Sequence, residues 1–390
     1  MTQELDKTPQ RSPCRWVSVL VGLVLVAAMA PVVVRSVNSP ARYNRTHTAI
    51  SGEELLSQCP WLKDTMHYWR AEVDLQAGPP KYADLGAFPV GNGRVFGIVG
   101  LQWPLTTIGQ LIGPSYQKQL GFFGNIVPWV AAEGKPVDLA QQSIAWAKEA
   151  PVVCVRTSSP DGLKLDVYYA AVPDQPAIVF VAAVGNNSKR VRRGLALNLS
   201  SNQPSAEVTP SGLVTSRGNI VMTAGLVGAR GLPTALTPSF PAKLSQRLKP
   251  LAAAGGAAVA YPLGTLGPGQ TVAKMGYVIF TTDQTATGQV VAALEQARLG
   301  VLDNCRAAWQ QWNKQVASLK SGSPRLDEFF EAQKYIVACQ QADGSGFSPM
   351  HGYTYLWVRD SNGPLRFFTA IGASDRIKQH LEYHFRACAK

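Results

Sequence analysis

Short runs of apolar or alternating residues dominate the chain between about Tyr68 and Thr282. Each run has the length of a strand, is rich in β-branched and aromatic residues, and is bounded by Gly, Pro, Asn or Asp. Examples are VVCVRTS, LKLDVYYAAV, AIVFVAAVG, GLALNLSS, GNIVMTAG and VAKMGYVIFTT. Because no segment with a helical period alternates with these runs, a parallel α/β sheet is not expected. The pattern predicts a large antiparallel β-sandwich, a β-supersandwich domain, over residues 68–285.

The hydrophobic period changes to that of a helix near Thr287. A linker helix is predicted within residues 286–323, where the apolar positions are Leu294, Val301, Leu302, Cys305, Trp309, Trp312, Val316 and Leu319. Residues 324–390 contain three more helical patterns, PRLDEFFEAQKYIVACQQ with a proline at its start, SNGPLRFFTAIG, and DRIKQHLEYHFRACAK. Gly372 is expected to stop the second of these, and Ser374 to cap the third. The apolar stripe of the third is Ile377, Leu381, Phe385 and Cys388.

An uncharged, strongly apolar stretch runs from Trp16 to Val34, after Lys7, Arg11 and Arg15. A helix needs roughly 20 apolar residues to cross a bilayer core, and cytoplasmic flanks are enriched in basic residues. We therefore interpret residues 1–35 as a cytoplasmic tail and a single transmembrane anchor, followed by a linker over 36–67 and an extracytoplasmic domain. The alternative is a cleaved signal peptide, since residues 28–30 resemble a small-x-small site, although Pro31 would then begin the mature chain.

Composition narrows the functional classes. With 390 residues the chain exceeds what one hydrophobic core usually serves, so more than one domain is expected. A hydrophobic fraction of 46% argues against extended disorder. The net charge of +12 is spread thinly, and its densest cluster is SKRVRR at residues 188–193. Because a nucleic-acid-binding protein gathers basic residues beside recognisable motifs, we expect no nucleic-acid partner.

The spacing of the cysteines and histidines does not indicate a metal or redox site. Of the six cysteines, none forms the C-x-x-C spacing typical of a zinc or redox site, and buried free thiols are expected. One disulfide, for example Cys305 with Cys339, is the alternative. His380 and His384 are spaced to lie on one face of a helix, but two imidazoles make an incomplete metal site, so we expect a pair at the surface. No metal or cofactor is predicted.

Two glycine-rich or aromatic motifs stand out from this background. The first, PVGNGRVFG from Pro89 to Gly97, is one residue longer than the dinucleotide fingerprint, and no clear helix follows it. It is therefore predicted to be a tight turn before a strand.

The second motif, YTYLWVRDS from Tyr353 to Ser361, places aromatic residues before adjacent Arg359 and Asp360. Aromatic faces stack on sugar rings, while a guanidinium and a carboxylate bind neighbouring hydroxyl groups. Alternatively, Arg359 and Asp360 merely cap the helix that they open, in front of buried aromatic residues. The chemistry of these residues favours neither interpretation over the other.

The segment GYTYLWVRDS resembles the G-Y-x-x-x-W-x-R-D segment of glucoamylase-like enzymes of glycoside hydrolase family 15. The stretch FPVGNGRVFGIVG is similar to the G-N-G stretch of the related families 65 and 95. The resemblance implies a six-hairpin glycosidase, with an N-terminal β-supersandwich, linker helices and an (α/α)6 barrel. It further implies that Arg359 and Asp360 bind hydroxyls of the sugar in subsite −1, with Tyr353 and Trp357 in the pocket wall.

The chain departs from this family after the motif. The family's barrel has twelve helices, and its catalytic glutamates lie on later helices, whereas residues 324–390 account for about three. Inverting hydrolysis needs an acid and a base roughly 6.5–9.5 Å apart. After Asp360 only Asp375 and Glu382 remain, and both are predicted to be solvated helix residues. We therefore expect a membrane-anchored relative of inverting α-glucan hydrolases that lacks the acid and base; the alternative is a non-catalytic module that binds glycan or protein.

Overall fold

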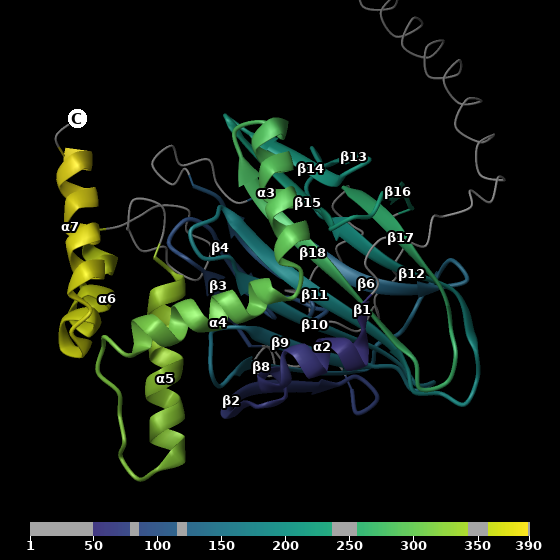
Figure 1. Ribbon diagram of the computed structural model, residues 1–390, viewed down its shortest axis with the longest axis horizontal. Helices are drawn as coiled ribbons and strands as arrows, with labels where there is room; N and C mark the ends of the chain where they lie inside the picture. The colour runs from purple at the N-terminus through teal and green to yellow at the C-terminus, as the bar shows by residue number, and fades with distance from the viewer. Residues whose placement is uncertain (1–49, 79–85, 115–122, 236–255, 342–357, 389–390) are drawn as a thin grey trace, which may run out of the picture. The chain divides into compact units, whose positions relative to one another are not determined.

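The computed structural model describes residues 50–78, 86–114, 123–235, 256–341 and 358–388 (Figure 1). These all belong to one unit of the chain, Thr48–Lys390. The stretch predicted as an anchor, residues 16–34, lies outside the described ranges. Within those ranges, no helix is both long and apolar enough to cross a membrane.

Two antiparallel sheets form the β-sandwich that the alternating runs predict. The first follows the order β13 (Glu207–Thr209), β14 (Gly212–Arg217), β15 (Ile220–Leu226), β18 (Thr271–Thr281), β11 (Ala177–Asn186), β10 (Leu163–Ala171), β9 (Val153–Ser158), β8 (Gln141–Ala147) and β2 (Thr65–Asp74), with β1 (Ile50–Ser51) beside β18. The second follows the order β16 (Leu232–Pro233), β17 (Ala257–Leu266), β12 (Arg192–Ser201), β6 (Ile126–Ala132), β5 (Ile108–Ile112), β4 (Phe96–Val99) and β3 (Phe88–Gly91), with β7 (Lys135–Pro136) beside β6. The six runs quoted above correspond to β9, β10, β11, β12, β15 and β18.

The sequence of a strand reflects its place in these sheets. Strand β11 is buried along its whole length, because it lies at the centre of the first sheet with neighbours on both sides. Its run AIVFVAAVG is accordingly apolar without alternation, as expected when both faces are covered. Strand β12 begins with exposed residues and ends with five buried ones, so burial changes along its length.

Residues 50–63, inside the stretch predicted as a linker over 36–67, form short ordered elements. Helix α2 (Gly52–Gln58) starts at Ser51, whose hydroxyl accepts a hydrogen bond from the backbone N–H of Glu54 at 3.0 Å. A 3₁₀ turn, η1 (Pro60–Lys63), follows, and Leu55, Cys59 and Leu62 are buried against the sandwich. Helix α2 has only seven residues, too few to produce a recognisable hydrophobic period.

The helical region follows β18, as predicted, but its first part differs from the single helix expected over 286–323. The structure has two helices there, α3 (Gln284–Ala297) and α4 (Gly300–Asn313). Arg298 separates them with φ +48°, a backbone conformation that a continuous helix does not allow. The remaining helices are α5 (Pro324–Cys339), α6 (Val358–Ile371) and α7 (Ser374–Cys388). Pro324 opens α5 and Gly372 follows α6, as predicted.

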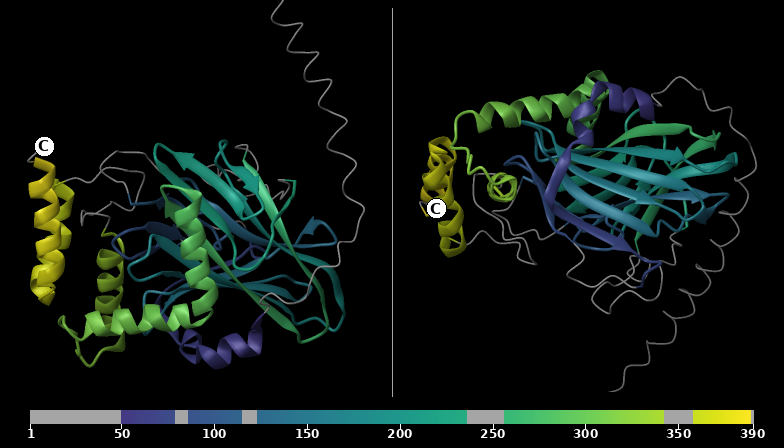
Figure 2. Two further views of the ribbon diagram at one scale, coloured as in Figure 1. Left: turned by 45° about the horizontal axis from the view of Figure 1, so that its top comes forward. Right: turned by 90° about the horizontal axis from the view of Figure 1, so that it is seen from below.

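Helices α4 and α5 lie against the sandwich (Figure 2), and aromatic side chains connect α4, α5 and the first sheet. Tyr335 of α5 meets Trp146 of β8 edge-on, with ring centroids 5.6 Å apart, and Trp309 of α4 at 4.8 Å. Its hydroxyl donates to the carbonyl of Lys148 at 2.8 Å. Glu328 of α5 also accepts hydrogen bonds of 2.8 Å from two backbone N–H groups of β2. The helical region and the sandwich therefore share one hydrophobic core.

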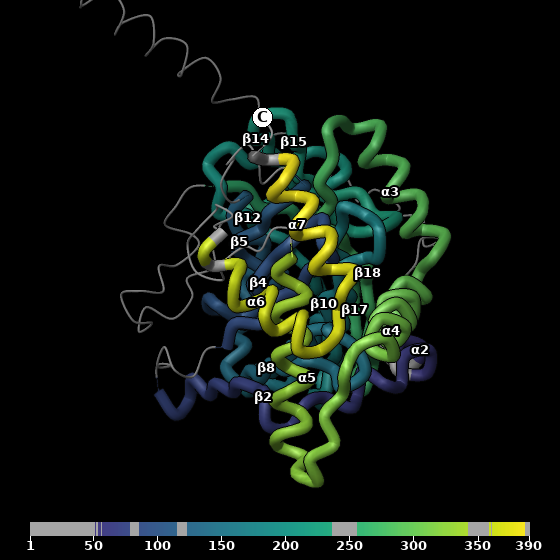
Figure 3. The backbone as a smooth tube through the Cα atoms, turned by 90° about the vertical axis from the view of Figure 1, so that its left-hand side faces the viewer, coloured from purple at the N-terminus to yellow at the C-terminus, as the bar shows by residue number. Residues whose placement is uncertain are grey.

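Helix α7 presents its residues differently from the sequence-based expectation. The predicted pair of surface histidines is wrong, because His380 is 1% exposed and its ring lies 4.3 Å from that of His384. Burial lowers the pKa of His384. The predicted apolar stripe instead includes exposed side chains, with Leu381 46% and Phe385 73% accessible. Figure 3 shows α6 and α7 in front, with α5 between them and the sheets.

Candidate functional site

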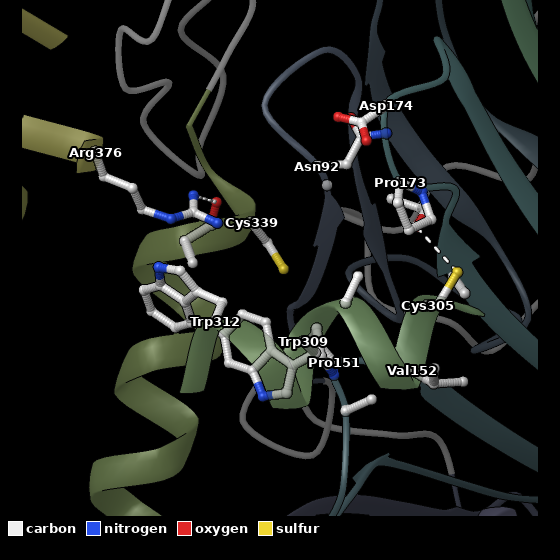
Figure 4. Close-up of a pocket in the computed structure, with 16 residues that line it drawn as sticks. Asn92, Pro151, Val152, Pro173, Asp174, Cys305, Trp309, Trp312, Cys339 and Arg376 are labelled. Carbon is white, nitrogen blue, oxygen red and sulfur yellow. Dashed lines mark hydrogen bonds between the residues drawn. The ribbon is translucent and has the colours of Figure 1, made fainter. Parts of the chain in front are cut away.

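A cavity of about 210 Å³ opens where the sandwich meets the helical region (Figure 4). Its walls come from the turn after β3, the turn between β8 and β9, the turn between β10 and β11, and helices α4, α5 and α7. The lining residues are Gly91, Asn92, Ala150, Pro151, Val152, Ala170, Ala171, Pro173, Asp174, Cys305, Ala308, Trp309, Trp312, Ala338, Cys339 and Arg376. Six chain segments far apart in sequence thus create one concave surface.

The first wall is the predicted tight turn of the G-N-G stretch, which joins β3 to β4. Asn92 holds this turn together, because its Oδ1 accepts hydrogen bonds from the N–H groups of Arg94 at 2.9 Å and Val95 at 3.1 Å. Its Nδ2 donates to the carbonyls of Val172 and Gln175. All the hydrogen-bonding capacity of this amide is therefore used in joining two turns, which confirms the prediction of a structural turn.

Gly91 allows the closest approach between the sandwich and the helices. A Cβ atom at this position would lie 2.0 Å from the backbone carbonyl oxygen of Cys339, at the end of α5. Since real Cβ contacts are never so short, no side chain fits between β3 and α5 without a backbone shift.

The turn between β10 and β11 supplies the acidic group of the cavity. Asp174 has φ +58°, a left-handed conformation that aspartate tolerates better than most residues. Its side chain is exposed, and no hydrogen bond or ion pair joins it to another described residue. A free carboxylate there accepts hydrogen bonds from hydroxyl or amine groups of a ligand.

Two tryptophans of α4 form the apolar wall. The rings of Trp309 and Trp312 lie 4.7 Å apart at 46°, and both side chains are at least nine-tenths buried. The indole N–H of Trp309 donates to Glu331 at 3.4 Å. That of Trp312 is buried without an acceptor among the described residues. The sequence identifies both only as apolar helix positions, because nothing in the local pattern distinguishes a cavity wall from a core.

Arg376, in the first turns of α7, is the cationic group of the cavity. Its Nη1 donates to the carbonyl of Ala338 at 3.3 Å and to Oε1 of Gln341 at 2.7 Å. Its guanidinium lies over the Trp312 ring, 4.7 Å from the centroid. Burial lowers its pKa, and the neighbouring Asp375 opposes this only in part. Sequence reasoning missed Arg376, since a lone arginine near a helix start carries no signature.

The two cysteines at the cavity are not suited to act as nucleophiles. Cys305 and Cys339 both line it, and both are free thiols, so the alternative of a disulfide between them is excluded. Burial raises the pKa of each to about 12. A thiol acts as a nucleophile through its thiolate, which is nearly absent at neutral pH when the pKa is so high.

The predicted sugar-binding residues lie at the start of α6. Arg359 occupies the second position of α6, where its side chain is exposed, and it does not line the cavity. Asp360 is the next residue of the same turn, as predicted, so both lie where the helix opens. Tyr353 and Trp357 lie outside the described residues. Asp375 and Glu382 are exposed on α7, which confirms the prediction that they are solvated helix residues.

No protein-family model and no curated protein matches this sequence. Among solved structures, the chain is similar to a kojibiose phosphorylase from the human microbiome, with a TM-score of 0.51 and 9% identity, over 81% of this chain and 48% of that one. It is also similar to a bacterial glucoamylase complexed with acarbose, with a TM-score of 0.53 and 12% identity, over 80% of this chain and 53% of that one. The chain thus spans about half the length of either structure and has a glycosidase-like fold.

Proposed function

We propose that this protein is a glycosidase-like protein of carbohydrate metabolism that binds α-glucan-like oligosaccharides at the start of α6. The observation that carries the proposal is the position of the Arg359-Asp360 pair at the opening of a helix, directly after the aromatic segment 353–357, in a chain with a glycosidase-like fold. The solved structures that share this fold are a kojibiose phosphorylase and a glucoamylase, both named for action on carbohydrates.

The chemistry of the pair suits sugar recognition. A guanidinium presents a planar fork of N–H donors to neighbouring hydroxyls, and a carboxylate accepts from two hydroxyls at once. Asp360 belongs to the first turn of α6, and the N-terminus of a helix is a favourable place for a negatively charged residue. Tyr353 and Trp357 would supply aromatic faces for the C–H side of the ring.

We propose that the segment of α6 and α7 contributes sugar binding rather than the acid and the base of a hydrolase. Hydrolysis with inversion needs two carboxyl groups facing each other across the bond that is cleaved. Asp375 and Glu382 are exposed on α7, and Glu382 lies 3.9 Å from Lys378 of its own helix. Neither carboxyl group is buried in a pocket of the described residues.

Two conservative variants test the sugar site. Asp360→Asn keeps the size of the side chain but removes its charge, and Arg359→Lys keeps the charge but loses the planar fork. We expect each to weaken the affinity for maltoheptaose at least about tenfold, with little change in melting temperature, because charge-assisted hydrogen bonds to the sugar are lost. Arg366→Lys, an exposed position on the same helix, is the matched control.

If the pair only caps α6, the same variants should behave in the opposite way. Each would then lower the stability by about 0.5–2 kcal/mol while the sugar affinity stays unchanged. That outcome would contradict the proposal that Arg359 and Asp360 bind sugar. Glucose release measured in the same samples separates an enzyme from a binding module, since binding without release supports the latter.

We also propose that residues 16–34 anchor the protein in a membrane as a single pass, with the described domains outside the cytoplasm. The support is the uncharged apolar stretch and the three basic residues that precede it. The protein should remain with membranes during carbonate extraction. A mature N-terminus found near Pro31 would instead establish a secreted protein.

A further inference from the structure

The two charged side chains of the cavity, Arg376 and Asp174, belong to opposite walls and are not joined by an ion pair (Figure 4). Two opposite charges near one cavity would normally attract each other into contact. Here the guanidinium of Arg376 is held by its bonds to the end of α5 and by its contact with Trp312, while the backbone of Asp174 belongs to the turn between β10 and β11. The cavity therefore keeps a cation and an anion apart.

The guanidinium retains unused donors. Its two bonds both leave from Nη1, so the N–H groups of Nε and Nη2 form no hydrogen bond with a described residue. No carboxylate of the described residues forms an ion pair with Arg376, and the Trp312 ring beneath it compensates only part of its desolvation. A partly buried cation without a counter-ion costs free energy, which an anionic group in the cavity would offset.

The other groups of the cavity restrict what that anion is attached to. The exposed carboxylate of Asp174 repels a second negative charge but accepts hydrogen bonds from hydroxyl groups. Ala308, Trp309 and Pro151 add apolar surface. The volume of about 210 Å³ is below the range of roughly 300–1,000 Å³ for drug-sized ligands, so a compound of about one sugar ring is the appropriate size.

We infer that this cavity binds a small polyhydroxy compound with one oxyanion, a sugar acid or a sugar phosphate, whose oxyanion contacts Arg376 and whose hydroxyls reach Asp174. The inference goes beyond the proposed function, since it concerns a different site, to which Arg359 does not contribute. It introduces an acidic ligand, whereas the site at α6 is proposed for neutral oligosaccharides. The two sites are tested separately, so a negative result for one proposal does not affect the other.

The experiment measures melting temperature and tryptophan fluorescence of the full chain with D-glucuronate, glucose 1-phosphate and glucose. Trp309 and Trp312 line the cavity, so a bound ligand should change their emission. We expect one or both acidic probes to raise the melting temperature and change the fluorescence in a saturable way, and glucose to do neither. Which acidic probe acts distinguishes a carboxylate from a phosphate ligand.

Two variants locate the binding. Arg376→Gln should weaken the affinity for the active probe by roughly tenfold to a hundredfold, because it removes a charge-assisted hydrogen bond. Ala308→Phe keeps Arg376 but fills the cavity, so it should abolish binding even if Arg376→Gln fails to fold. Arg386→Gln is the matched control, with the same loss of charge at an exposed position of α7.

The inference is overturned if neither acidic probe affects the unmodified protein. It is also overturned if a probe acts equally on the unmodified protein and on Ala308→Phe, because binding then takes place elsewhere. A response to glucose as strong as that to the acidic probes would likewise contradict a role for the guanidinium.

Discussion

Adjacent residues of the G-N-G stretch serve two different purposes. Gly91 is needed because another backbone, that of Cys339, occupies the space of its side chain. Asn92 is needed because its Oδ1 accepts hydrogen bonds from two backbone N–H groups of its own turn, and its Nδ2 donates to two carbonyls of the β10–β11 turn. Gly91 thus brings the sandwich close to α5, and Asn92 joins the turns of its two sheets, so this stretch is part of the framework of the cavity.

Replacing Gly91 by alanine should destabilise the protein by about 1–3 kcal/mol, the usual cost of overpacking. The reason is steric, since the new Cβ would meet a backbone carbonyl that moves only together with α5. Thermal unfolding measures the effect. Gly288→Ala is the control, because Gly288 lies in α3 with nothing near its missing Cβ, and it should stabilise by about 0.5–1 kcal/mol. Equal melting temperatures for the two variants would contradict the contact.

Asn92→Asp changes two donors into acceptors without changing the shape of the side chain. The carbonyls of Val172 and Gln175 would lose their partner and face a carboxylate, at a cost of about 1–3 kcal/mol for each unpaired group. The urea midpoint of unfolding should fall accordingly, whereas Asn304→Asp at an exposed position of α4 should leave it nearly unchanged. A midpoint that stays constant in Asn92→Asp would show that the turn is not held by this amide.

At the scale of elements, the break between α3 and α4 decides where the tryptophans of the cavity lie. Without it, α4 would continue in the direction of α3. The break has φ +48° at an arginine, a conformation that costs an L-residue of order 1–3 kcal/mol. The folded structure maintains it because Leu294, Leu299 and Leu302, on both sides of the break, are all buried in the shared core.

Arg298→Gly should therefore stabilise the protein, by about 0.5–2 kcal/mol. Glycine adopts this conformation without strain, although its more flexible unfolded chain reduces the gain. The side chain of Arg298 is exposed, so Arg298→Ala removes every side-chain atom beyond Cβ while keeping the strain, and it should give no gain. Comparing the two melting temperatures isolates the backbone effect. A glycine variant less stable than the alanine variant would contradict it.

At the scale of the whole molecule, the sandwich and the helical region depend on one another. Tyr335, Trp309 and Trp146 form a continuous aromatic contact from helix to sheet, and Glu328 completes hydrogen bonds that β2 lacks. The cavity exists because of this arrangement, since each of its walls belongs to only one of the two regions.

Residues 50–388 should accordingly unfold in one cooperative transition. Differential scanning calorimetry of the protein should show one heat-absorption peak for this part, with far-UV circular dichroism and tryptophan fluorescence changing at the same temperature. Two separated transitions, with the helical signal lost first, would show that the interface contributes little to stability.

The amino-acid sequence by itself determined the elements whose period is long and regular. The strand-length apolar runs of β9, β10 and β18, the uniform apolarity of β11, and the proline and glycine that bound α5 and α6 depend on local chemistry, so they were predictable. The turn at Asn92 followed from its glycines, and the position of Arg359 and Asp360 at the start of α6 followed from the pattern behind them. Elements of one or two turns, such as α2, were not predictable.

The tertiary structure alone decided what depends on contacts between distant segments. The break at Arg298 has no glycine to mark it, and the burial of His380 follows from the side of α7 that faces its neighbours. Arg376 and Asp174 are separated by about 200 residues, and only the docking of α7 near the β10–β11 turn makes them opposite walls of one cavity. A hydrophobic pattern records whether a position is buried, but not which partner buries it, and that is the physical reason for the difference.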